Sequence, residues 1–244
     1  PMRTMNRAIE SFFEKPRMRQ LFERYATYNG SDPFRTPATL NNIPHLEYNL
    51  GAYALGGGIY SIAQALEKLA RKKSVEFLLS TQVDRIIYGS GGLPGKVKGI
   101  EVNGTFHPYT IVVSNVDVTP TYRDLLGDEE ASAFKRYKKL EPSSSGLVYY
   151  WGMKKSNPEL GLNNIFFSED YRLDFIDIFE KKRCPADPTV YVNITSKHSR
   201  EDAPGAGENW FILVNAPYDD GQDWTGIEEE FREKVIGRVS RGLG

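Results

Sequence analysis

The sequence predicts an α+β fold in which a mostly antiparallel β-sheet is flanked by helices. Apolar side chains recur at spacings of three and four residues in several segments, which is typical of amphipathic helices. Between these segments lie short runs rich in valine, isoleucine, tyrosine and phenylalanine, and a glycine-rich turn at residues 89–95 joins two of them. Strands joined by short turns, with helices interspersed, favour layered α+β architecture over an all-parallel sheet.

Residues 1–50 predict a helical segment. In residues 3–28 the apolar spacing indicates two short amphipathic helices, separated by Pro16. Residues 29–58 contain many turn-forming residues and predict a long ordered connection with a short helical piece near Thr39. Ordered connections of this length are usually functional.

Residues 51–120 predict a helix followed by a β-meander. The helix covers residues 59–70, and the basic run Arg71-Lys72-Lys73 at its end complements the helix dipole. The expected strands are residues 75–80, 83–88, 97–102 and 105–114.

Residues 121–244 predict a second alternation of strands and helices. The expected strands lie near residues 145–151, 164–167, 189–195 and 210–216. The expected helices are residues 122–125, 129–137, 171–181 and 226–239.

Composition excludes several classes of protein. The 31 basic and 32 acidic residues nearly cancel, so we expect no nucleic-acid partner. Cys184 is the only cysteine, and His45, His107 and His198 lack metal-ligand spacing, so we expect neither a disulfide nor a metal site. No apolar run approaches the roughly 20 residues of a membrane span, and the N-terminus does not resemble a signal peptide. We therefore expect a cytoplasmic location.

A series of short motifs follows the order found in one flavoenzyme family. In the first half they are Gly57-Gly58, Ile62, Ala65-Leu66, residues 83–86, Gly99-Ile100, Val112-Val113-Ser114-Asn115, Asp117 and Thr121-Tyr122-Arg123. In the second half they are Ser143-Ser144-Ser145-Gly146, Trp151-Gly152, Asn164-Ile165-Phe166-Phe167-Ser168, Asp187-Pro188-Thr189 and Ala203-Pro204. In this order, over nearly the whole chain, they resemble the bacterial-type phytoene and carotenoid desaturases. Residues 24–30 and 43–47 are most similar to the desaturases that act on hydroxylated or partly desaturated carotenoids.

This resemblance implies a two-domain FAD oxidoreductase. Residues 1–50 would be a helical segment on the substrate side, residues 51–120 an insert of the flavin domain, and residues 121–244 the substrate-binding domain. The glycine fingerprint G-x-G-x-x-G, which places a pyrophosphate at a helix N-terminus, does not occur in the chain. We therefore expect a fragment whose partners include the missing flavin-domain segments of the same polypeptide. The parent enzyme would use FAD, and this chain alone would bind none and be inactive.

The resemblance also suggests binding residues. It places Val83, Ser114 and Asn115 beside the cofactor. A polyene has almost no polar groups, so the tunnel that binds it should be lined by apolar and aromatic side chains. Seven aromatic residues of the predicted strands could supply this lining: Tyr149, Tyr150, Trp151, Phe166, Phe167, Tyr191 and Phe211. Of these, Tyr149, Trp151, Phe167 and Tyr191 are the candidate substrate residues, and core packing is the alternative role of each. For the proton acceptor the nearest options are Arg19, Glu23 and Arg24, so the catalytic residue stays unassigned.

Three functions follow from these observations. The first is a carotenoid desaturase that forms C=C bonds in a long polyisoprenoid and passes hydride to flavin. The second is a carotenoid isomerase on the same scaffold, and the third is a stand-alone module that binds a hydrophobic ligand. Because carotenoids partition into bilayers, we also expect peripheral contact with the inner membrane surface. The candidate docking face, with core burial as its alternative, comprises Phe12, Phe13, Met18, Leu21 and Phe22.

Overall fold

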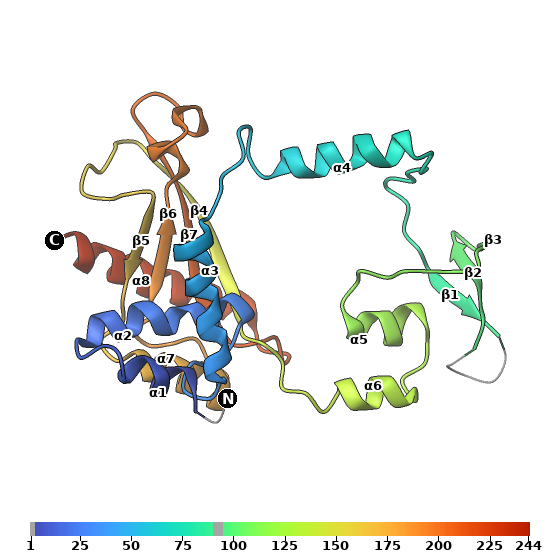
Figure 1. The fold of residues 1–244 in the computed structure, drawn as a ribbon, viewed down its shortest axis with the longest axis horizontal. Coiled ribbons are helices and arrows are strands. Elements are labelled where there is room, and N and C mark those ends of the chain that lie inside the picture. The colour runs from blue at the N-terminus through green and yellow to red at the C-terminus, as the bar shows by residue number, and fades with distance from the viewer. Residues whose placement is uncertain (1–2, 90–94) are drawn as a thin grey trace. The chain divides into compact units, whose positions relative to one another are not determined.

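The computed structural model describes residues 3–89 and 95–244 (Figure 1). The chain divides into two compact units. Unit 1 combines Pro1–Ala52 with Pro142–Gly244, and unit 2 comprises the intervening Tyr53–Glu141. Each unit contains an antiparallel sheet and helices, which confirms the predicted α+β class. The assignment of flavin-side and substrate-side roles to parts of the chain stays a prediction.

Unit 1 is built on a four-stranded sheet with the order β4-β7-β6-β5. Its strands are β4 (Ser145–Met153), β5 (Asn163–Phe166), β6 (Val190–Asn193) and β7 (Glu208–Ala216). All four were predicted to within a few residues. Along β7 every second side chain is buried, which is the pattern of a strand with one face against a core.

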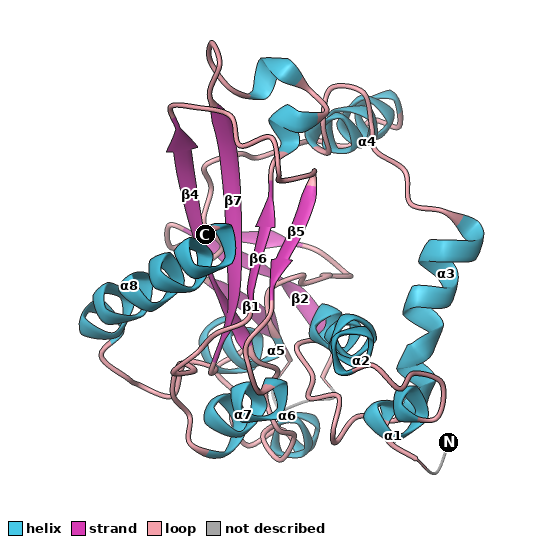
Figure 2. Ribbon diagram, turned by 90° about the vertical axis from the view of Figure 1, so that its left-hand side faces the viewer, coloured by secondary structure: helices cyan, strands magenta, loops and turns pink. Residues whose placement is uncertain are grey.

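Helix α8 (Trp224–Leu243) covers one face of this sheet, as Figure 2 shows. Asp223 caps its first turn by accepting a hydrogen bond from the Thr225 amide at 3.2 Å. Its buried side chains recur every four residues, so they form one stripe. This stripe packs against the even-numbered residues of β6 and β7: Phe231, Val235 and Val239 meet Val190, Val192, Ile194, Ile212 and Val214. Each fully buried side chain of this size contributes about 1.5–3 kcal/mol.

The N-terminal part of unit 1 forms a helical layer. Its elements are α1 (Met5–Glu10), α2 (Pro16–Glu23), η1 (Arg24–Asn29), η2 (Ala38–Asn41) and α3 (Asn42–Leu50). The prediction of a mostly irregular connection after residue 29 was wrong for α3. Proline does not prevent this helix, because Pro44 lies in the first turn, where the amide has no intrahelical acceptor.

The remaining helices of unit 1 are short. Residues 171–181, predicted as one helix, form α7 (Tyr171–Phe175) and the π-helical η4 (Ile176–Glu180). Two 3-10 turns, η5 (Thr195–Lys197) and η6 (Arg200–Asp202), lie between β6 and β7.

Unit 2 contains a three-stranded sheet with the order β1-β2-β3. Its elements are α4 (Tyr60–Lys72), β1 (Arg85–Tyr88), β2 (Val97–Val102), β3 (Thr105–Pro108), α5 (Val118–Pro120), η3 (Thr121–Leu125) and α6 (Ser132–Tyr137). Of the predicted turn at residues 89–95, residues 90–94 lie outside the described part of the chain.

Two strand predictions in unit 2 were wrong. Residues 75–80 form no strand, because the chain turns sharply at both ends of the run, where Ser74 and Ser80 have φ values of 59° and 53°. The strand expected over residues 105–114 ends at Pro108, which pairs with Gly99 of β2. The Tyr109 amide still donates to the Lys98 carbonyl at 3.0 Å, but residues 110–114 belong to no strand.

Candidate functional site

The face of the unit 1 sheet that points away from α8 is the candidate site. Directly paired residues of antiparallel strands point to the same side, so the register defines rows across this face. One row is apolar and runs through all four strands: Val148, Leu213, Tyr191 and Ile165. The next row places two aromatic rings beside two amides: Tyr150, Phe211, Asn193 and Asn163. This face therefore offers an apolar track with amide groups along one edge.

A cavity of about 730 Å³ lies where this face meets the helical layer. The sheet contributes Asn163, Ile165, Tyr191, Leu213 and Asn215. The helical layer contributes Arg24, Tyr25, Thr27 and Tyr28 from η1, and Glu47 and Tyr48 from α3. A cavity of 300–1,000 Å³ with an apolar lining and a few polar groups is typical of a small-molecule site. We call it the η1–α3 pocket.

Hydrogen bonds and a cation–π contact fix several side chains of the η1–α3 pocket. The Arg24 guanidinium lies 4.6 Å from the centre of the Tyr191 ring. The Tyr191 hydroxyl donates to Asn163 Oδ1 at 2.7 Å, so this ring is held from both sides.

A second polar group in the pocket centres on Glu47. The Tyr28 hydroxyl donates to Glu47 Oε1 at 3.2 Å. Burial raises the pKa of the Tyr25 hydroxyl, and its hydrogen bonds with Glu47 and Tyr48 raise it further, so Tyr25 stays neutral at physiological pH. The other carboxylate oxygen, Glu47 Oε2, is buried and accepts no hydrogen bond from the described residues.

The structure does not bring the four predicted substrate residues together. Tyr191 lines the η1–α3 pocket. Tyr149 and Trp151 point to the opposite face and pack into the core against α8. Phe167 follows the end of β5 and contacts Tyr171, with 6.4 Å between the ring centres. The common groove expected for these four side chains is therefore absent from the described residues, and their roles toward a substrate stay predictions.

The sequence of β4 indicates which of its residues lie on the open face of the sheet. Gly146 and Gly152 alternate with the core residues, so they occupy the same face as Val148 and Tyr150. Glycine contributes no side chain to a core and is compatible with close approach of a ligand. The glycine parity thus favours Tyr150 over Tyr149 as a residue of the open face.

The three proton-acceptor candidates are also separated. Arg24 lines the η1–α3 pocket. Glu23 is buried, accepts a hydrogen bond from Asn6 Nδ2 at 2.7 Å, and has a raised pKa because of its burial. The Arg19 guanidinium donates to the Phe13 carbonyl at 2.7 Å and pairs with Glu10 at 3.5 Å.

An apolar groove of about 540 Å³ lies on the helical layer between α1, α2 and α3. Phe12 is 75% exposed at this groove, whereas Phe13 and Phe22 stack at 4.7 Å and pack on the Met5–Ile9–Ala26 core. Of the predicted docking residues, Phe12 and Met18 are thus exposed, and Phe13, Leu21 and Phe22 are partly buried.

Unit 2 carries the three predicted cofactor residues. The β1–β2 pairing extends to the Asp84 amide, which donates to the Glu101 carbonyl at 2.8 Å, so Val83 lies just outside the ladder with its main chain available to a ligand. The Ser114 hydroxyl lies 3.0 Å from Thr121 Oγ1, and Asn115 is exposed. Main-chain and hydroxyl groups of this kind can form hydrogen bonds with an adenine, and contact of these residues with FAD stays a prediction.

The glycines before α4 do not fit the pyrophosphate of FAD. A Cβ added at Gly56, Gly57 or Gly58 would meet no atom within 4 Å, so the backbone there is not part of a closed cradle. The described residues therefore provide no pyrophosphate site at these glycines.

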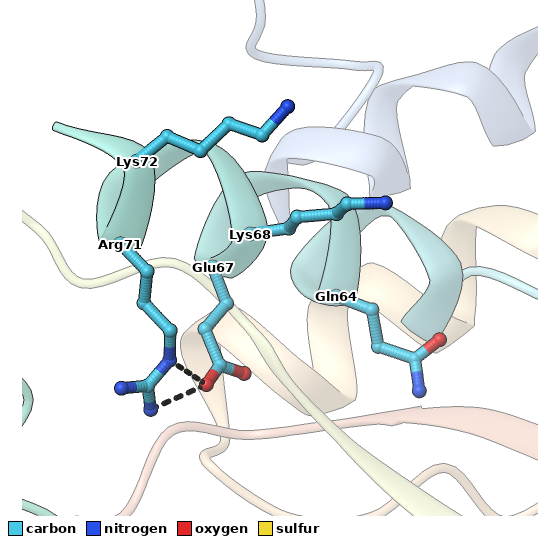
Figure 3. Close-up of a pocket in the computed structure, with 5 residues that line it drawn as sticks. All are labelled: Gln64, Glu67, Lys68, Arg71 and Lys72. Atoms are coloured by element: carbon cyan, nitrogen blue, oxygen red, sulfur yellow. Dashed lines mark hydrogen bonds and ion pairs between the residues drawn. The ribbon is translucent and has the colours of Figure 1, made fainter.

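The basic end of α4 forms a shallow hollow in unit 2 (Figure 3). Its lining comes from this one helix: Gln64, Glu67, Lys68, Arg71 and Lys72. Arg71 Nη2 lies 2.7 Å from Glu67 Oε1, one helical turn away. Such a pair is typical of a solvated helix face, and we place no site here.

The chain is similar to carotenoid-modifying enzymes along nearly its full length. It is 45% identical over 231 residues to the 1-hydroxycarotenoid 3,4-desaturase of Flavobacterium sp. (strain P99-3), a match that covers 95% of this chain and 46% of the relative. It is 33% identical over 240 residues to the 4,4'-diaponeurosporene oxygenase of Staphylococcus aureus (strain MRSA252), which covers 98% of this chain and 48% of the relative. The chain thus spans about half the length of the curated relatives it matches. No family model matches the chain.

Solved structures share the fold. An oxidoreductase from Methanosarcina mazei has a TM-score of 0.68 at 18% identity, with 97% of this chain and 52% of that chain covered. A protein from Pyrococcus furiosus has a TM-score of 0.60 at 16% identity, with 97% and 55% covered. Among the described helices, none has the length and apolar character needed to cross a membrane.

Proposed function

Because the chain belongs to the carotenoid desaturase family, in its hydroxycarotenoid branch, we propose that it handles the substrate in an FAD-dependent desaturase. The enzyme would introduce C=C bonds into a long polyisoprenoid. The observation that carries the proposal is the apolar row across all four strands, which leads into the η1–α3 pocket. A linear polyene needs an extended apolar surface of this kind, because it is held mainly by burial of apolar area.

Desaturation removes a hydride and a proton from adjacent carbons as the new double bond forms. FAD, when bound, supplies the oxidant that accepts the hydride. Val83, Ser114 and Asn115 would contact its adenine end, and the pyrophosphate would be bound by segments of the same polypeptide beyond this chain. The residues of the open sheet face would orient the polyene and keep water from it, with Tyr191 fixed between Arg24 and Asn163.

Substrate would reach the enzyme from a membrane. We propose that the groove at Phe12 makes peripheral contact with the inner membrane surface, in a protein located in the cytoplasm. Two exposed aromatic side chains that line the groove support this role: Phe12 and Tyr48.

Product analysis with the full-length enzyme tests the proposal. The complete gene is expressed in a host that makes linear carotenoids, with and without a hydroxyl end group, and the pigments are separated and weighed by mass spectrometry. A desaturase yields a product lacking two hydrogens, with absorption at longer wavelength. A product of unchanged mass would indicate the isomerase, added oxygen without a new double bond would indicate an oxygenase, and bound but unchanged pigment would indicate the binding module.

A further inference from the structure

We infer that the η1–α3 pocket is the subsite for a hydroxylated end of the polyene, and that the Glu47 carboxylate accepts the hydrogen bond of the substrate hydroxyl. The inference rests on the proposed function and adds to it the residue that selects the substrate. Four features of the pocket support it. One carboxylate oxygen has no hydrogen-bond donor, and the formal charges of the lining residues cancel. Part of the lining is apolar, and the pocket lies at the end of the apolar row.

The acceptor is Glu47 Oε2. It is buried and receives no hydrogen bond from the described residues, whereas Oε1 of the same carboxylate is held by Tyr28 at 3.2 Å. A buried acceptor without a donor destabilises the folded protein, and more so when it is charged. A donor from outside the protein, a water molecule or a substrate hydroxyl, can therefore bind this oxygen.

The formal charge of the pocket lining favours a ligand whose hydrogen-bond donor is uncharged. Arg24 and Glu47 are the charged side chains of the η1–α3 pocket, so its formal charge is balanced. An ammonium or a carboxylate would upset this balance and would also lose its hydration on entering. An alcohol donates one hydrogen bond and brings no charge, so it matches the free oxygen of Glu47.

One side of the lining suits the hydrocarbon next to that hydroxyl, although Thr27, Asn163 and Asn215 also line the pocket. Ile165, Leu213 and the ring of Tyr191 form the floor, in the same row that continues to Val148 at the far strand. With a volume of about 730 Å³, the pocket can take the end of a polyene while the remaining chain follows the apolar row. This geometry distinguishes the two ends of the substrate.

The expected selectivity is large. A site built to hydrogen-bond a hydroxyl rejects the analogue lacking it by about 10⁴–10⁵-fold in favourable cases, whereas an apolar pocket alone discriminates by about 10–200-fold. A polyene with a hydroxylated end should therefore be strongly preferred over the matching hydrocarbon.

The test compares Glu47→Leu and Glu47→Gln with the wild-type full-length enzyme. Two quantities are measured with a 1-hydroxylated linear carotenoid and its non-hydroxylated counterpart: kcat/KM for desaturation, and equilibrium binding followed by the absorption shift of the polyene. Leucine removes the acceptor, so the preference for the hydroxylated substrate should fall at least 100-fold. Glutamine keeps a neutral acceptor, so the preference should fall about tenfold. Glu229→Gln on α8 is the matched control, because it removes an exposed carboxylate on the opposite side of the sheet, and it should keep the wild-type preference.

The outcomes separate this inference from the proposed function. If the wild type desaturates both substrates and Glu47→Leu keeps its preference for the hydroxyl, the inference is wrong and the proposed function stands. If the wild type converts neither substrate but binds the hydroxylated one more tightly in a Glu47-dependent way, the inference holds and the proposed function fails. If Glu47→Leu does not fold, the glutamine variant decides through the same two measurements: an unchanged preference overturns the inference, and a tenfold loss supports it.

Discussion

Replacing Glu208 by glutamine should destabilise unit 1 in a strongly pH-dependent way. The Glu208 side chain is fully buried at the start of β7. It accepts hydrogen bonds from Ser156 Oγ at 2.6 Å and Trp210 Nε1 at 2.8 Å, and it lies 2.7 Å from Lys197 Nζ. Burial raises the pKa of Glu208, but these donors more than offset burial and hold that pKa at about 2.

The sign and size of the effect follow from this pKa. The pKa in the folded state lies below the ordinary value of 4.5, so the carboxylate stabilises the fold above about pH 4.5. That stabilisation is lost as the pH falls toward 2. A pKa difference of this size corresponds to about 3 kcal/mol, since one pKa unit equals about 1.4 kcal/mol. Glu208→Gln should therefore lower the free energy of unfolding by about 3 kcal/mol at pH 7 and by much less near pH 3.

Denaturant titration followed by tryptophan fluorescence measures this effect. The three tryptophans of the sequence, Trp151, Trp210 and Trp224, all belong to unit 1, so the signal reports that unit. Glu229→Gln serves as the control and should change the free energy of unfolding by less than about 0.5 kcal/mol. Equal stability of wild type and Glu208→Gln at pH 7, or a loss that does not shrink on acidification, would refute the reasoning.

Three further predictions concern pH, membrane contact and flavin. Burial raises the pKa of Asp174 to about 7, so the stability this group contributes is fully present below about pH 3.8 and is lost as the pH rises through 7. Asp174→Asn should remove this slope from a thermal-unfolding series between pH 5 and 8, and an unchanged slope would contradict the assignment. Phe12→Glu should reduce flotation of the full-length enzyme with liposomes several-fold, while Leu140→Glu, at an exposed apolar residue of unit 2, should not; equal flotation of all three proteins would remove the proposed docking role. The purified chain should elute colourless from gel filtration after incubation with FAD, because the glycines before α4 provide no pyrophosphate site, and co-eluting flavin absorbance would contradict this.

The strands of the unit 1 sheet were predicted well because each contains a run of residues that favour β-structure. Runs such as Trp210-Phe211-Ile212-Leu213-Val214 combine β-branched and aromatic residues over the length of one strand. The apolar run at residues 75–80 looked similar, but it forms no strand, because pairing depends on a partner elsewhere in the chain.

The η1–α3 pocket could not be predicted in this way. Glu47 and Tyr191 line the same pocket although more than 140 residues separate them, and no local sequence pattern predicts that they lie close together. The expectation that Tyr149, Trp151 and Tyr191 share one face did not take the alternation of side chains into account, since a shift of one residue along β4 moves a side chain to the other face. The family resemblance predicted the type of chemistry, whereas the open face of the unit 1 sheet could be identified only from the strand register of the structure.

Unit 1 is formed by two segments that are separated in the sequence by unit 2, and this affects folding during synthesis. Its helical layer is synthesised first, but the sheet that this layer covers lies wholly within residues 145–216. At translation rates of about 5–20 residues per second, roughly 5–20 seconds pass between synthesis of the helical layer and synthesis of the first strand, β4. During that interval the side chains of η1 and α3 that later line the pocket have no sheet to contact. The nascent chain therefore exposes these aromatic side chains before the sheet is synthesised, and chaperone binding to residues 5–50 should precede the completion of the pocket.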